Sequence, residues 1–200
     1  MNANCPALTG GAFCLNAKLR ISEIWWTVGI AVRGKPVQET RMDWDTVAVD
    51  FESDGGLRDI YVLDTTVADW QAAIDVLRNE VTGLIFNIGD ETSELPIDAT
   101  EIFYGARGEP IPVLNRSLYV PFGEGVLVCH FVGEYEIEFD LSPLDVNDET
   151  LPQLVNFMRL LGKATGKPVL LTMENAQDLQ IMRFEPSMGD VIYTGPVWAR

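Results

Sequence analysis

Strict alternation of charged and apolar residues most constrains what this chain can fold into. From Glu134 to Leu141 the sequence reads EYEIEFDL, with a carboxylate at every second position. Successive side chains of a β-strand point to opposite faces of the sheet. We therefore expect a strand that places Tyr135, Ile137, Phe139 and Leu141 in the core and its carboxylates on the other face. Burying four unpaired carboxylates is too costly, so the acidic face should contact water, a partner or a cation.

Alternation of the same kind predicts most of the other strands. Residues 13–35 contain two alternating runs and predict an N-terminal β-hairpin. Residues 45–65 predict a second hairpin, because two such runs flank Asp54-Gly55-Gly56, whose glycines permit a tight turn. Residues 125–141 repeat this pattern around a glycine. Shorter strands are expected at 84–88, 100–105, 168–173 and 179–186.

Two stretches change to a helical period. Residues 66–81 and 150–163 each carry an apolar stripe at the spacing of one helix face. Thr66 with Asp69, and Thr150 with Gln153, have the spacing of N-terminal capping pairs. Gly166 follows the second stretch and is expected to end that helix.

The order of these elements predicts an α+β fold with antiparallel sheets and two helices. It reads as strand–strand–helix–strand–strand twice, over approximately 43–106 and 118–195, which suggests a pseudo-duplication. We expect residues 1–200 to form a single globular domain built of these two units, with the N-terminal hairpin (13–35) added to them.

Charge is the strongest compositional constraint on function. The 200 residues include 30 acidic and 14 basic ones, a formal net charge of −16. Residues 1–42 carry five basic and two acidic residues, a balance of +3, and the remainder carries nine and 28, a balance of −19. Such a chain repels nucleic acids and anionic membranes and attracts basic proteins and cations. Acidity that serves only solubility is the alternative.

The motif search predicts no catalytic, metal or cofactor site. His130 is the only histidine and follows Cys129 in a strand-like run, so one of the two should be buried and the other exposed. One histidine and three scattered cysteines do not make a zinc pattern, and the segment that begins at Asp145 fails the EF-hand pattern. Phosphate- and dinucleotide-binding loops are absent from the sequence. The sequence also lacks a signal peptide and an apolar run of membrane-spanning length, so we expect a cytoplasmic protein. The empty motif search favours a protein that is not an enzyme but leaves an enzyme open as an alternative.

The candidate binding residues follow from the acidic strand, the loop after it and one tryptophan. Trp25 should point away from the apolar face of its strand, where it would be either an exposed hot spot or covered by another element. A merely solvated outer sheet face is the alternative for the carboxylates. The predicted partner-binding residues are Glu134, Glu136, Glu138, Asp140, Asp145, Asp148 and Trp25.

These features favour a non-enzymatic protein that docks a basic protein partner. In general character the chain resembles bacterial immunity proteins and other small inhibitors, which are acidic, compact and without a catalytic constellation. No motif is shared with them, so the resemblance assigns no residue. The alternatives are an enzyme or small-molecule-binding protein with a pocket between the two units, and an acidic secretion chaperone. Self-association through the basic N-terminal hairpin is a further alternative.

Overall fold

The computed structural model describes residues 42–111 and 116–195, which all lie in one compact unit. The strands are β1 (Arg58–Leu63), β2 (Ile85–Ile88), β3 (Glu91–Ser93), β4 (Arg116–Phe122), β5 (Gly125–His130), β6 (Glu136–Leu141), β7 (Val169–Met173), β8 (Ala176–Glu185) and β9 (Asp190–Tyr193). The helices are α1 (Trp44–Val47), α2 (Val67–Glu80), α3 (Thr100–Phe103) and α4 (Leu151–Thr165), with 3₁₀ turns η2 (Ala48–Phe51) and η3 (Pro143–Asp145).

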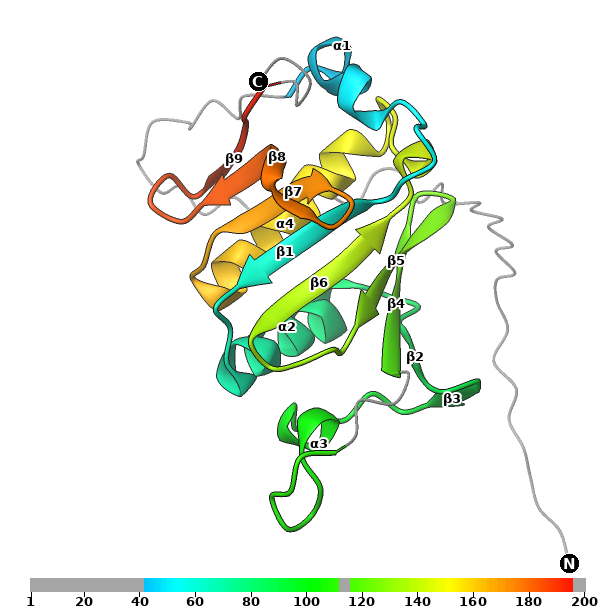
Figure 1. Ribbon diagram of the computed structural model, residues 1–200, viewed down its shortest axis with the longest axis vertical. Helices are drawn as coiled ribbons and strands as arrows, with labels where there is room; N and C mark the ends of the chain where they lie inside the picture. Colours follow the sequence, from blue (N-terminus) through cyan, green and yellow to red (C-terminus); the bar gives the residue numbers. More distant parts are fainter. Residues whose placement is uncertain (1–41, 112–115, 196–200) are drawn as a thin grey trace, which may run out of the picture. The chain divides into compact units, whose positions relative to one another are not determined.

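Within the described ranges the nine strands form one antiparallel sheet, in the order β3-β2-β4-β5-β6-β1-β7-β8-β9 (Figure 1). β1 is central, between β6 and β7. Its register places Asp59 opposite Asp140 of β6, and Tyr61 opposite Glu138. Strands that are distant in sequence thus lie side by side, and this pairing assembles the site described below.

The two long helices begin and end where local chemistry favours it. Thr66 and Asp69 form a reciprocal capping box at the start of α2, as the sequence predicts. The predicted cap of α4 is wrong, because the Thr150 side chain makes no capping hydrogen bond and instead donates to the carbonyl of Asp145. α4 ends at Gly166, which adopts the left-handed conformation (φ 68°).

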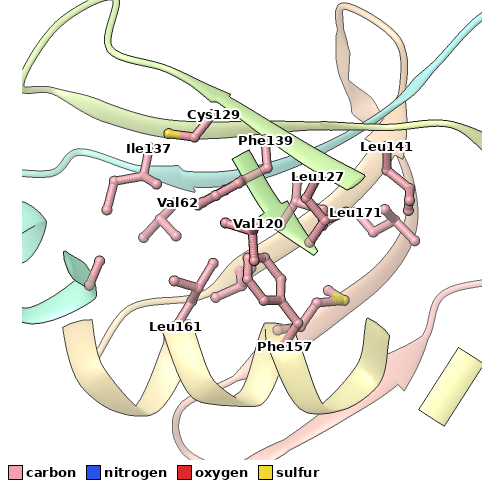
Figure 2. Packing of buried hydrophobic residues seen from close by; sticks show 14 of the residues in the cluster. Val62, Val120, Leu127, Cys129, Ile137, Phe139, Leu141, Phe157, Leu161 and Leu171 are labelled. Atoms are coloured by element: carbon pink, nitrogen blue, oxygen red, sulfur yellow. The ribbon is translucent and has the colours of Figure 1, made fainter. Parts of the chain in front are cut away.

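The hydrophobic core lies between these two helices and one face of the sheet. α4 contacts β1, β7, β8 and β9, and it also packs on α2. Figure 2 shows Phe157 and Leu161 of α4 beneath Phe139 and other apolar residues of the sheet. The rings of Phe139 and Phe157 meet edge to face, with centroids 5.0 Å apart. We call the sheet face that packs on α2 and α4 the inner face, and the opposite one the outer face.

The predicted α+β class with an antiparallel sheet is confirmed, but several details are not. The predicted duplication is not confirmed: one strand, β1, precedes α2, whereas the three-strand run β4-β5-β6 precedes α4. Residues 45–51 are helical rather than extended, because the Asp43 side chain caps α1 and the rings of Trp44 and Phe51 stack 5.9 Å apart. The strand predicted at 100–105 is wrong as well, since 100–103 form α3.

Some predictions fall outside the described residues, namely the N-terminal hairpin (13–35) and Trp25. In the part of the chain that the structure describes, none of the helices has both the length and the apolar character that crossing a membrane requires.

Candidate functional site

The acidic strand has the two faces that its sequence predicts, but it starts later. Ile137, Phe139 and Leu141 are buried on the inner face, and Glu136, Glu138 and Asp140 are half-buried on the outer face. Because the two sets alternate along β6, the apolar set fixes which way the carboxylates point.

A turn before β6 makes two of our expectations wrong. Thr65 holds this turn, since its amide donates to the carbonyl of Tyr135 and its hydroxyl to that of Glu134. Tyr135 is therefore 61% exposed instead of entering the core. Glu134 leaves the carboxylate row and accepts a hydrogen bond from the Tyr104 hydroxyl at 2.8 Å, which raises the pKa of Tyr104.

A fourth carboxylate, which the sequence analysis missed, lies beside the row. Asp59 of β1 is only 2% exposed. One oxygen of Asp59, one of Glu138 and one of Asp140 all lie within 4.8 Å of one another. Asp59 accepts hydrogen bonds from the Asn175 amide (2.6 Å) and the Tyr61 hydroxyl (2.9 Å). Three carboxylates at this spacing repel one another, so a positive charge nearby would stabilise the cluster.

Tyr61 is shared between two of these carboxylates. Its hydroxyl lies 2.9 Å from Oδ2 of Asp59 and 2.7 Å from Oε1 of Glu138. A phenol has one proton to donate, so it satisfies only one of the two acceptors at a time. Burial and these two hydrogen bonds raise the pKa of Tyr61 well above its usual range. The tyrosine therefore stays neutral and can donate to either carboxylate.

His130 borders the cluster on β5. Its Nε2 lies 3.3 Å from Oδ2 of Asp140, and its Nδ1 lies 3.4 Å from Oγ of Ser117 on β4. As predicted, one member of the Cys129–His130 pair is buried and the other exposed: Cys129 is fully buried, and burial raises the pKa of its thiol. His130 can place a positive charge beside Asp140 only when it is protonated.

The Ser117–His130–Asp140 chain superficially matches the residue types of a hydrolase triad. A nucleophilic serine also needs backbone N–H groups aimed at the developing oxyanion. Ser117 lies inside β4, which pairs with β2 on one side and β5 on the other. Its strand's amides are thus used in the sheet, and the arrangement does not support acyl transfer.

Two carboxylates of the cluster hold their protons more tightly than usual. Burial raises the pKa of Glu138; the hydrogen bond from Tyr61 opposes this, and the charges of Asp59, Asp140 and Glu136 add to it. Burial also raises the pKa of Asp140, against the opposing effect of His130. A bound cation would lower both pKa values and so would oppose both shifts.

A small pocket opens at this cluster. Its volume is about 210 Å³, and its lining residues are Leu57, Asp59, His130, Glu138, Asp140, Glu174 and Asn175. Neither Lys nor Arg is among them. The Oε2 atom of Glu174 accepts a hydrogen bond from the Leu57 amide at 3.2 Å, which fixes this rim of the pocket. We call it the carboxylate pocket. Carboxylate oxygens are also the ligands that hard divalent cations prefer, so Asp59, Glu138 and Asp140 are the residues that could hold a metal ion.

The remaining predicted residues lie elsewhere. Asp145 is half-buried in η3, and Asp148 is exposed in the loop before α4. Neither lines the carboxylate pocket. Of the predicted set, Glu138 and Asp140 line the carboxylate pocket together with Asp59, whereas Glu136 lies next to Glu138 on the same face of β6 but does not line the pocket.

Comparison of the chain with models of protein families, with curated proteins and with solved structures finds no match. Inferences about its function therefore rest on the geometry and charge described above.

Proposed function

We propose that this protein is a non-enzymatic binding protein that docks a basic protein partner on the outer face of its sheet. A Lys or Arg side chain of the partner enters the carboxylate pocket. The observation that carries the proposal is the cluster of Asp59, Glu138 and Asp140, with oxygens within 4.8 Å of one another. Among the described residues no Lys or Arg forms an ion pair with any of the three, and we assign the compensating charge to a partner.

The charge of the whole chain supports a protein partner. At a net charge of −16 the molecule attracts basic proteins over several ångströms and speeds their encounter with it. A partly desolvated carboxylate pocket then adds specificity, because an Arg or Lys of a wrong partner that misses it leaves the carboxylates unpaired. An inhibitor or toxin-immunity role is the concrete form of this proposal.

A small cation, organic or metallic, is the second candidate ligand, and the spacing of the three carboxylate oxygens favours it. The test compares thermal unfolding of the wild type and of Asp59→Asn with and without Mg²⁺, Ca²⁺, Mn²⁺ or free guanidinium-bearing amines. A ligand that occupies the pocket raises the wild-type midpoint more than that of the variant. Equal shifts in both proteins would count against this candidate.

Retention of a basic partner is the test of the main proposal. The outer-face variant carries Glu136→Gln, Glu138→Gln and Asp140→Asn. The control variant carries Glu91→Gln, Glu94→Gln and Glu101→Gln, three exposed positions, and removes the same charge. Wild type, outer-face variant and control variant are used to capture proteins from lysate of the source organism at low and moderate salt.

We expect wild type and control variant to retain the same stoichiometric basic protein, and the outer-face variant to lose it. Loss from both variants alike would mean that net charge alone drives capture. Retention by the outer-face variant, with unchanged salt dependence, would refute the proposed site.

A further inference from the structure

A second acidic surface lies away from the carboxylate pocket and shares no lining residue with it. It is a groove of about 770 Å³ between the end of α2, the β4–β5 turn and the loop that leads from η3 into α4. The lining residues are Glu80, Val81, Thr82, Pro121, Phe122, Gly123, Glu124, Leu144, Asp145, Asn147, Glu149, Thr150 and Gln153. We call it the acidic groove. It contains Asp145, which the sequence singled out and the carboxylate pocket leaves unexplained.

Two glycines in the β4–β5 turn give the groove its shape. Gly123 has a φ of 55°, and a Cβ there would come within 2.7 Å of the Thr150 side chain. A Cβ on Gly125 would overlap the Asp145 carboxylate. Because both positions lack a side chain, the turn packs closely on the η3–α4 loop and keeps Asp145 against it. A side chain at either glycine would have to displace the Thr150 or Asp145 side chain, so these two glycines help to set the shape of the groove.

The lining determines which occupant fits. Glu80, Glu124, Asp145 and Glu149 line the groove, and no Lys or Arg does. Glu80 is also the last residue of α2, whose C-terminal end carries partial negative charge. At the rim, Leu144 is 73% exposed, and a bare leucine suits the aliphatic stem of an Arg or Lys side chain.

The shape favours a peptide over a small molecule. Small-molecule sites bury most of the ligand surface among apolar side chains, whereas most residues that line this groove are polar and most are solvent-exposed, although the two sets differ. An extended segment needs only one side covered, and successive basic side chains of such a segment can reach carboxylates that lie on different elements. The charge of the lining selects a basic segment.

We infer that the acidic groove receives an extended, Arg- or Lys-rich segment of the protein partner. This inference rests on the proposed function, since it assigns a second contact to the same partner. Binding at two separate acidic surfaces raises the overall affinity, because the second contact forms within the first complex.

The test uses a defined probe, the fluorescein-labelled peptide acetyl-(Arg-Ala)₄-amide, and fluorescence polarisation at low ionic strength. The groove variant carries Glu80→Gln, Glu124→Gln and Glu149→Gln. It is compared with wild type, with the outer-face variant and with the control variant. Each of the three variants removes three negative charges. Thermal unfolding by circular dichroism confirms that each variant is folded, and the single Glu124→Gln variant in the exposed turn serves if the triple groove variant is not.

We expect the groove variant to bind the probe about tenfold more weakly than wild type, since three exposed ion pairs together contribute about that factor. The control variant should stay within about threefold of wild type. Loss only in the outer-face variant would refute the groove while leaving the proposed function standing. Equal loss in all three variants would refute both the groove and the outer face as binding sites. A wild type that does not bind the probe would refute the groove as a binding site.

Discussion

Replacing Glu138 by Gln should stabilise the protein at neutral pH. The substitution keeps the size of the side chain and an oxygen that can accept from Tyr61, but it removes the negative charge that faces Asp59 and Asp140. Two unit charges at the upper limit of this separation, 4.8 Å, repel by about 1 kcal/mol in water and by about 3 kcal/mol near a protein surface. After allowance for screening, we expect a gain of about 1–2 kcal/mol in the free energy of unfolding, or about 3–6 °C in the thermal midpoint.

The gain should depend on pH with a defined sign. Burial raises the pKa of Glu138 above its ordinary value of 4.5, so the folded state binds the proton more tightly than the unfolded state. Ionised Glu138 therefore destabilises the fold at neutral pH, and this penalty disappears as the pH falls through the raised pKa toward 4.5. The difference between Glu138→Gln and wild type should be full near pH 7 and close to zero near pH 4.

Urea unfolding of the wild type and Glu138→Gln across this pH range measures the difference directly. Glu101→Gln is the control, because Glu101 is exposed on α3 and its substitution changes the net charge equally. The proposed repulsion between the carboxylates would be refuted by either of two results. One is a Glu138→Gln variant with no higher free energy of unfolding than this control near pH 7, and the other is a gain that does not shrink as the pH falls.

Three further predictions concern the fold. Gly162→Ala should lower the free energy of unfolding by about 1–3 kcal/mol, since an added Cβ overlaps the Phe184 ring; Lys163→Ala beside it is the control, and an equal effect would contradict the close contact. Thr66→Ala should cost about 1 kcal/mol by removing the capping box of α2, with Thr66→Ser close to wild type in the same urea assay. With Cys5 and Cys14 replaced by Ser, a thiol reagent should modify Cys129 only as fast as the protein opens, because this thiol is fully buried; rapid modification under native conditions would contradict its position.

The cluster that destabilises the fold is also the proposed binding site, and the two statements share one physical cause. Carboxylates held close together at one buried and two half-buried positions raise the free energy of the unbound protein. A bound ammonium or guanidinium group compensates that charge, so part of the relieved repulsion contributes to affinity. A variant that gains stability by losing Glu138 should therefore bind the partner more weakly, which is a common relation between stability and function.

Local patterns in the sequence predicted much of the secondary structure. The alternation of β6, the capping box of α2 and the end of α4 at Gly166 all follow from interactions within a few residues, so they can be inferred without the fold. Where a long-range contact overrides the pattern, the inference fails. The alternation of β6 continues back to Glu134 in the sequence, but hydrogen bonds from Thr65 turn the chain there.

The candidate site depends on long-range contacts of this sort. Sequence alone determined that Glu136, Glu138 and Asp140 share a polar face, because the residues between them must be buried. Only the tertiary structure placed Asp59 beside them, by pairing β1 with a strand far along the chain. Tyr61 and Glu138, which share a hydrogen bond across this pair, are 77 positions apart. The side-chain period fixes a face, but strand order depends on how helices and strands together bury their apolar surface, and no short stretch of sequence encodes that choice.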